Sequence, residues 1–536
     1  MTAVPRGGAS AAPVTPPDRR PRAAAVFVAL GIFASRVFGL VRQMLQARYL
    51  GTAAAADAFT AAFKIPNILQ NLFGEGSLSA SFIPVYSRLL AEGKDEEAGR
   101  VAGAVAALLM LVVAVVVLVG VVATPALIPL IAPGFDPEKK RMTIQLTRIL
   151  FPGAGIFVVS AWCLGILNSH RRYLLSYSAP VLWNVAMIAA LLWFGKSQQP
   201  LDLASTLAWA SVAGALLQFL IQVPTTLRLA RHLHFALDTR STHVRSVARN
   251  FGPAFVSRGA VQISGYIDIW LASFLPTGMV ATIFYAQAVY VLPVSLFGMS
   301  VSAAELPEMS RALGDHDQVS TYLRTRLGTG LRNIAFFVIP SAAAFLAFGD
   351  VIAALLFQRG RFSATDSHYA WGILAGSAVG LLATTMGRLY SSTYYALHDT
   401  RTPLRFAVVR VILTTLLGYL FALPLPRLLG IDAHWGAAGL TASAGIAGWI
   451  EFVLLRSRMN RRIGDTGIPA RLVATLWAAA AVGVAAGWEM RALSAHQPPF
   501  ISRVLVLATY GIVYLVTTAA LRVPEAARLT ARLRYR

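Results

Sequence analysis

The chain has 536 residues, of which 56% are hydrophobic and 13% are charged, and its mean hydropathy is +0.62. A soluble protein of this length would carry roughly twice that charged fraction, so the composition excludes a soluble enzyme with a short anchor, a disordered protein and a fibrous one. The net charge of +23 would suggest nucleic acid in a soluble protein. In a membrane protein, basic loops that fix topology and contact anionic lipid explain it better, so we expect no nucleic-acid partner.

Apolar runs recur along the whole chain after residues 1–22, which are rich in proline, alanine and basic side chains and are expected to form a disordered cytoplasmic tail. This pattern predicts an all-α polytopic membrane protein with about fourteen spans. The segment 75–90 either continues the second span or re-enters the membrane after it. The expected spans are 24–47, 53–74, 98–124, 143–168, 178–195, 204–227, 249–275, 279–304, 332–357, 369–395, 404–425, 435–456, 471–488 and 502–521.

Lysine and arginine are distributed unequally between the two sides that this span assignment defines. When basic residues in the first or last three positions of a span are counted with the adjacent loop, thirty fall on the side of the two termini and ten on the opposite side. Because cytoplasmic loops carry the excess of basic residues, we expect both termini in the cytoplasm. The charge distribution therefore predicts a multi-pass membrane protein whose first and last segments lie on the cytoplasmic side.

An internal repeat relates the two halves of the chain. Ser35-Arg36 recurs as Ser257-Arg258, and Ile83-Pro84 recurs as Leu306-Pro307 at almost the same separation. Six spans lie between the copies, and an even number gives both copies the same orientation, as in parallel transporter repeats. The domains expected are six-helix lobes at 23–230 and 249–458 around a central cleft, a basic linker at 231–248, two further helices at 459–523 and a basic cytoplasmic tail at 524–536.

Polar side chains form stripes on the first two spans. One stripe contains Arg42, with Arg36 on its neighbour, and the second span carries Asp57, Lys64 and Asn67 at helical spacing. A charge at the bilayer centre costs at least about 2.5–3.5 kcal/mol, so these groups must face one another or a water-filled cavity. A structural network that pairs Asp57 with Lys64 or Arg42 is the alternative. The excess of positive charge favours a cavity for an anion, since arginine binds phosphate oxygens bidentately.

The second half has intramembrane charges of its own. Arg258 repeats Arg36 and is expected to face the same cleft, whereas Asp268 is a candidate cation site, the counter-ion of Arg258 or a residue of the outer interface.

Glu75 of the first half stands between two glycines, where a bent helix would expose backbone amides to its carboxylate. The chain lacks a complete P-loop, GxSxG and HExxH, and its nine His residues lack ligand spacing. We therefore expect a transporter without a catalytic, ATP-binding or metal site.

The first hairpin resembles the MurJ (MviN) family, the lipid II flippases of peptidoglycan synthesis in the multidrug/oligosaccharidyl-lipid/polysaccharide (MOP) exporter superfamily. The matching segments are Ser35-Arg36-Val37-Phe38-Gly39-Leu40-Val41-Arg42, Ala56-Asp57-Ala58-Phe59, Ala62-Phe63-Lys64-Ile65-Pro66-Asn67, Glu75-Gly76, Gly165-Ile166-Leu167-Asn168 and Asp399-Thr400-Arg401-Thr402-Pro403. The resemblance implies undecaprenyl diphosphate carrying a disaccharide-pentapeptide as substrate, and alternating access between the lobes. It also implies a lipid-tail groove along the last two helices, and a diphosphate held by Arg36 and Arg42.

The sequence departs from the family pattern at three charged positions. Gln43 replaces the usual Asp, and Gln70 and Ala288 replace usual arginines. Our hypothesis is that Arg258 compensates for the missing positive charge. Asp268 matches the aspartate of a sodium site found in some members, but Thr414 and Gly418 at the partner positions are weak ligands. Coupling to a monovalent cation or to the membrane potential is thus left open, and no cofactor is expected.

These observations predict a flippase that moves lipid II from the cytoplasmic to the outer leaflet as a monomer, in contact with membrane lipids and with cell-wall synthesis proteins as candidate partners. One alternative is an exporter of another lipid-linked oligosaccharide, or of a drug, in the same superfamily, because the missing arginines could signal a changed headgroup. The other alternative is a non-transporting, lipid-binding scaffold.

Overall fold

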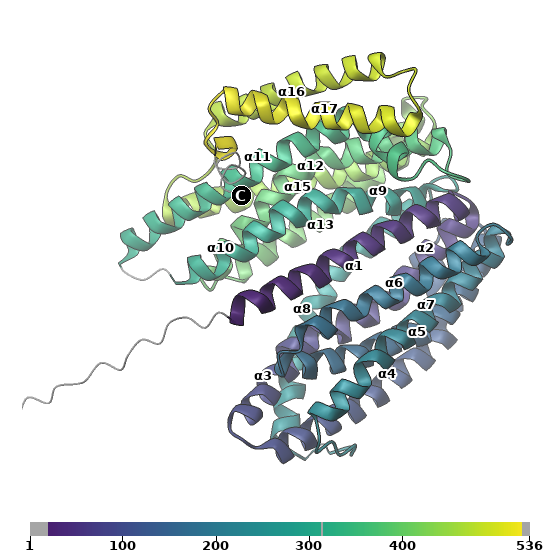
Figure 1. Cartoon of the computed structure of the whole chain (residues 1–536), viewed down its shortest axis with the longest axis vertical. Coiled ribbons are helices and arrows are strands. Elements are labelled where there is room, and N and C mark those ends of the chain that lie inside the picture. Colours follow the sequence, from purple (N-terminus) through teal and green to yellow (C-terminus); the bar gives the residue numbers. More distant parts are fainter. Residues whose placement is uncertain (1–19, 239, 312–314, 528–536) are drawn as a thin grey trace, which may run out of the picture.

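The computed structural model describes residues 20–238, 240–311 and 315–527, with the side chains of 20–30, 32, 75, 76, 253, 254, 256–264 and 316 left out of the description. The expected tail at 1–22 and most of the one at 524–536 lie outside the described residues. The described chain is made of helices joined by turns, without a β-strand, which confirms the all-α fold. The two ends of the described chain lie on the same side of the molecule (Figure 1), and we call the opposite side the distal side.

The first lobe follows the expected order of spans, and α3 continues α2 after a break at Gly74. Gly74 lies between two helices, with its backbone outside the helical region, and its amide bonds to the carbonyl of Gln70. The predicted continuation of the second span through 75–90 is therefore helical. The helices are α1 (Arg20–Leu50), α2 (Ala54–Phe73), α3 (Glu75–Ala91), α4 (Asp95–Ile131), α5 (Pro137–Ser169), α6 (Tyr173–Phe194) and α7 (Pro200–Leu229).

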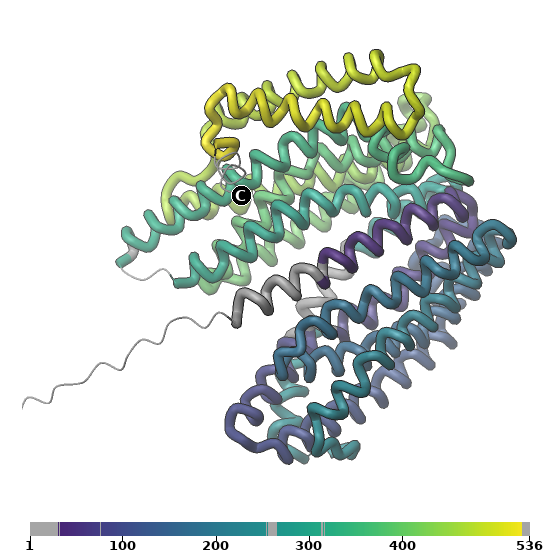
Figure 2. The backbone as a smooth tube through the Cα atoms, viewed as in Figure 1, coloured from purple at the N-terminus to yellow at the C-terminus, as the bar shows by residue number. Residues whose placement is uncertain are grey.

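The second lobe repeats this arrangement, and two additional helices pack against its outer face (Figure 2). The eighth expected span is divided by a π-helical turn, η1, between α9 and α10. The elements are α8 (Thr242–Ala272), α9 (Met279–Pro293), η1 (Val294–Met299), α10 (Ser300–Ser310), α11 (His316–Leu356), α12 (Ala364–Ala396), α13 (Arg401–Ala422), α14 (Pro424–Leu428), the 3-10 turn η2 (Ala433–Trp435), α15 (Gly436–Ile463), α16 (Ala470–Leu493) and α17 (Pro499–Ala520).

Eleven helical segments of the described chain are long and apolar enough to cross a membrane, by length and composition. They coincide with eleven of the expected spans, and the other three expected spans are α1, α2 and α8. These three helices carry the intramembrane charges that the sequence singled out, including Arg42, Lys64 and Asp268. These three helices therefore bring the charges between the lobes, where lipid need not solvate them.

Helix α8 crosses from one lobe to the other and begins before the expected span. Val244 and Val247, near its start, are buried in the core of the first lobe among residues of α3 to α5. Ile269 and Leu271, near its end, are buried in the core that includes the second lobe. The segment expected to be a linker up to residue 248 thus contributes its last turns to a packed helix.

A proline in α11 fixes the position of the last helix. Pro340 has no amide hydrogen, so the carbonyl of Phe336 loses its partner within the helix. The hydroxyl of Tyr514 in α17 donates to that carbonyl at 2.6 Å, and Tyr510 donates to the carbonyl of Pro340 at 2.6 Å. The additional hairpin α16–α17 is therefore joined to the second lobe by polar contacts as well as apolar packing.

Candidate functional site

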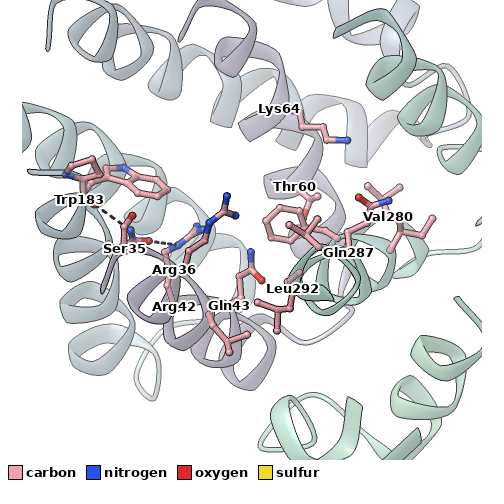
Figure 3. A pocket seen from close by; sticks show the side chains of 18 of the residues that line it. Ser35, Arg36, Arg42, Gln43, Thr60, Lys64, Trp183, Val280, Gln287 and Leu292 are labelled. Atoms are coloured by element: carbon pink, nitrogen blue, oxygen red, sulfur yellow. Dashed lines mark hydrogen bonds between the residues drawn. The ribbon is translucent and has the colours of Figure 1, made fainter. Parts of the chain in front are cut away.

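A cavity of about 710 Å³ lies between the two lobes, bounded by α1, α2 and α6 on one side and by α8 and α9 on the other. Figure 3 shows Arg36, Arg42 and Gln43 of α1 between Trp183 of α6 and Leu292 of α9. The polar stripes of the first two spans contribute part of its polar lining, and α6, α8 and α9 contribute the rest. Its polar lining side chains include Ser35, Arg36, Arg42, Gln43, Thr60, Lys64, Asn184, Asp268 and Gln287.

Arg42 is held by uncharged groups only, among the residues that the structure describes. Its Nε donates to Oδ1 of Asn184 at 3.1 Å and its Nη1 donates to Gln46 at 3.4 Å. The guanidinium also lies 4.6 Å from the centre of the Trp183 ring, a cation–π distance. The side chain is buried, so a full positive charge is fixed in orientation without a carboxylate to neutralise it.

Three cations and one carboxylate line the cavity among the described side chains. Arg36 is exposed to the open space, and Lys64 donates to the carbonyl of Gly265 at 3.4 Å. Asp268 is the one acidic lining residue among the described side chains, and Lys64 and Arg410 are close enough to act on it electrostatically. The remaining excess of positive charge attracts an anion, and a low-dielectric wall strengthens that attraction.

The other predicted positions divide into those that reach the cavity and those that do not. Gln43 and Ala288 both line it, so these two positions contribute uncharged side chains to the cavity wall. Asn67 and Gln70 are half-buried on α2 and are not among the described lining residues. The side chains of Glu75 and Arg258 lie outside the described part of the chain, so their predicted roles stay predictions.

Asp57 does not pair with Lys64 or Arg42, which corrects one of the expected alternatives. It lies in the first turn of α2, at the distal end, and accepts a bond from Lys139 Nζ at 3.2 Å with both side chains almost fully buried. Its two oxygens also accept the backbone amides of Gly278 at 2.7 Å and Ala281 at 2.9 Å. One carboxylate of the first lobe thus caps the start of α9 in the second lobe, where the helix dipole favours negative charge.

Further contacts between the lobes surround this cap on the distal side. The amide of Arg361 donates to the carbonyl of Arg48 at 2.8 Å, and the hydroxyl of Tyr285 donates to the carbonyl of Gly51 at 3.2 Å. Thr52 donates to the carboxylate of Asp366 at 2.8 Å. The two lobes are therefore in direct contact at the distal end, beyond the cavity.

Sequence reasoning missed several of these partners for identifiable reasons. Lys139 was counted as an ordinary basic residue of a loop, although it begins α5 and is buried. Trp183 and Asn184 were overlooked because Asn184 is one polar residue in an otherwise apolar span. That isolated amide was the available signal, since a polar group within a span needs a partner.

Comparison with known sequences gives consistent matches along the chain. A family model described as lipid II flippase MurJ matches residues 46–510. A probable lipid II flippase MurJ from Rhizobium meliloti is 31% identical over 477 residues, which cover 87% of this chain and 86% of that protein. The lipid II flippase MurJ of Burkholderia cenocepacia is 31% identical over 434 residues, which cover 80% of this chain and 81% of that protein.

Comparison with solved structures supports the same fold. A structure of lipid II flippase MurJ in an inward closed conformation matches with a TM-score of 0.76 and 22% identity, covering 92% of this chain and 98% of that one. An inward-facing multidrug resistance MATE transporter of the MOP superfamily matches with a TM-score of 0.63 and 17% identity, covering 82% of this chain and 98% of that one. Since the family model extends from α1 to α17, this multi-pass membrane protein belongs to the MurJ family of lipid II flippases.

Proposed function

We propose that this protein moves lipid II from the cytoplasmic to the outer leaflet of the bacterial cytoplasmic membrane by alternating access of the cavity between its lobes. The observation that carries the proposal is the excess of cations in that cavity, three against one carboxylate among the described lining residues. The diphosphate of lipid II is the densest negative charge of the substrate. Arginine recognises its oxygens with paired, charge-assisted hydrogen bonds.

Arg42 and Arg36 have different roles in this mechanism because their side chains differ in mobility and exposure. Arg42 is buried and oriented by Asn184 and Trp183, so it presents a fixed charge. Arg36 is exposed and able to follow a phosphate as it enters. Lys64 on α2 adds a third positive charge, and Arg258 is proposed to extend this surface on α8. Together these groups exchange water for phosphate at the entrance of the cavity.

The distal contacts and the cavity volume support a stage of the cycle in which the distal side is closed and the whole headgroup is not yet bound. A volume of about 710 Å³ falls within the range of sites for drug-sized ligands, whereas two sugars and five amino acids form a larger headgroup. Loading of the whole headgroup therefore requires the lobes to separate at the side of the chain termini while the Asp57 cap stays closed. Release requires the opposite change, in which the carboxylate of Asp57 leaves the start of α9.

We propose that both chain termini are cytoplasmic, as the charge distribution indicates, so that the distal side faces outward. Net transport then needs a bias, and the membrane potential supplies about 2.3 kcal/mol for each charge moved through 100 mV. Whether a monovalent cation at Asp268 contributes is tested by replacing sodium in a transport assay and measuring Asp268→Asn beside the wild type. Monomeric state and contacts with cell-wall synthesis proteins stay predictions.

The first test replaces the essential flippase of a depletable bacterial host with this chain. Growth and the exposure of lipid II on the outer leaflet are measured for the wild type, Arg36→Ala and Arg42→Ala. Arg148→Ala is the matched control, because Arg148 lies in α5, is exposed and contacts the backbone carbonyl of Val121 instead of the cavity. We expect the wild type and the control to restore both readouts and the cavity variants to fail.

A different outcome points to a different substrate. If the inserted wild type restores neither readout and the purified protein does not bind lipid II, the proposal is wrong. The uncharged residues Gln43 and Ala288 in the cavity wall then favour another lipid-linked oligosaccharide with a different charge pattern. Binding of lipid II without transport would instead favour the scaffold.

A further inference from the structure

A second, smaller cavity of about 430 Å³ lies far from the first, at the distal side of the second lobe. It is enclosed by the end of α11, the start of α12 and the turn between α16 and α17. Eight of its fourteen lining residues have polar side chains. The polar side chains that line it are Asp350, Gln358, Ser367, His368, Arg491, Gln497, Ser502 and Arg503.

Positive charge exceeds negative charge in this cavity. Arg491 and Arg503 line it against the single carboxylate of Asp350, and Arg491 Nη2 lies 2.9 Å from that carboxylate. Arg359 is close enough to act electrostatically on Arg503 and lies over the ring of Phe500. Counting these groups, the described residues leave two positive charges without a counter-charge.

The two arginines retain donors for a ligand. Arg503 donates to the carbonyl of Ala354 at 3.0 Å and to Gln358 at 2.6 Å. Within the described part of the chain, these bonds use two of the five N–H donors of its guanidinium. Arg491 approaches Asp350 through one nitrogen and is about half exposed, so its other donors are accessible from the cavity.

The position of the cavity indicates where its ligand comes from. It lies where α11 and α16 end and α12 and α17 begin, at the level where a membrane-spanning helix meets the headgroups. Exposed aromatic side chains occur at the same level, including Trp488 and Phe500 next to the turn between α16 and α17. Aromatic rings of this kind mark the membrane–water interface.

We propose that this cavity binds the phosphate of a lipid headgroup in the leaflet at the distal side, with Arg491 and Arg503 as its ligands. A phosphodiester offers acceptor oxygens to the free N–H donors and balances part of the excess charge. Arg503 also holds the end of α11, so it is both a ligand and a structural residue. A bound headgroup would join α11 to the hairpin α16–α17 at the end opposite the Tyr514 contact.

The test measures phospholipid retained by the full-length protein in detergent, by native mass spectrometry with phosphatidylglycerol as the probe. Arg491→Gln removes a charge-assisted bond and should weaken retention about tenfold or more. Asp350→Asn removes the competing carboxylate and should strengthen it. If the Arg491–Asp350 ion pair served only to hold the helices together, Arg491→Gln and Asp350→Asn would change phospholipid retention in the same direction. Arg427→Gln is the control, because Arg427 is exposed on the same side but outside the cavity.

Competition with inorganic phosphate distinguishes a site for a lipid headgroup from a site for free phosphate. Displacement of phosphatidylglycerol by phosphate in the wild type, and not in Arg491→Gln, would confirm that the phosphate group carries recognition. Binding of phosphate without retained lipid would keep the anion site and overturn the lipid headgroup as its source. Equal retention by the wild type, Arg491→Gln and Asp350→Asn, with all three folded, would overturn the proposal.

Discussion

Substitution of Asp57 by asparagine should open the distal side of the cavity. The variant keeps an acceptor oxygen but removes the charge, and it leaves Lys139 buried with Thr277 as its remaining hydrogen-bond partner among the described residues. Removing one partner of a buried ion pair costs about 3–5 kcal/mol. Solvent screening does not reduce this cost, because the Asp57 and Lys139 side chains are only 1% and 5% exposed. A loss of about 3 kcal/mol confined to the closed arrangement shifts its equilibrium by roughly 150-fold.

The assay uses a cysteine introduced at Val280, which lines the cavity next to the cap and is 5% exposed. Cys163 is the single native cysteine, so Cys163→Ser provides a clean background. A membrane-impermeant maleimide added outside intact cells should label the cysteine faster in Asp57→Asn than in the parent. The reasoning is refuted if the labelling rate of a folded Asp57→Asn variant equals that of the parent.

Thermal stability provides an independent check of the same prediction. Adding Lys139→Met to Asp57→Asn removes the unpaired buried cation, so the double variant should be more stable than Asp57→Asn alone. A double variant whose stability is simply the sum of the two single losses would show that the two residues are not coupled.

Gly278→Ala should also favour the open arrangement. Gly278 has φ of +96°, and an added Cβ would lie 2.6 Å from the carbonyl oxygen of Thr52, so the substitution should destabilise the closed arrangement by about 1–3 kcal/mol. The maleimide assay should then show faster labelling of the cysteine at position 280 than in the parent. Arg42→Lys keeps the charge but loses the Asn184 and Trp183 contacts, so lipid II binding should weaken about tenfold, and unchanged affinity would argue against a positioned guanidinium. The amide of His434 donates to Asp432 and lowers the pKa of that carboxyl to about 2. The turn at Asp432 should therefore be unaffected above pH 4 and loosen only as the pH falls from about 4 towards 2, whereas Asp432→Asn should loosen it at neutral pH, as hydrogen exchange of this turn would report.

Most of the fold could be predicted from the sequence because the bilayer imposes a strong pattern on helix length and polarity. Each expected span corresponds to one helix except the eighth, which is divided among α9, η1 and α10. The break between α2 and α3 falls at Gly74, where the second expected span ends and the segment 75–90 begins. The start of α8 could not be predicted, since its first turns are amphipathic and pack on the other lobe. Periodicity gives the apolar face of a helix but not the lobe that it contacts.

The cavity was predictable in its cations but not in its geometry. Arg36, Arg42, Lys64 and Asp268 do line one cavity, as the cost of intramembrane charge requires. The partner of Asp57 was not predictable, because it depends on how α2, α5 and α9 pack against one another at the distal end. A carboxylate within a span must find compensation, and the sequence alone does not say whether a side chain or two backbone amides will provide it.

The closure at the distal side depends largely on main-chain atoms. Arg48, Gly51, Gly278, Ala281 and Arg361 contribute carbonyl or amide groups to it, and these groups are present whatever side chain a residue carries. Such a seal tolerates substitution at most of its positions while depending on a few that set backbone shape and charge. A saturation mutagenesis survey of this region should therefore find most substitutions tolerated, with sharp intolerance at Asp57 and at the two glycines with positive φ, Gly51 and Gly278. Few of the residues that form the gate would then be identified as essential by their side chains.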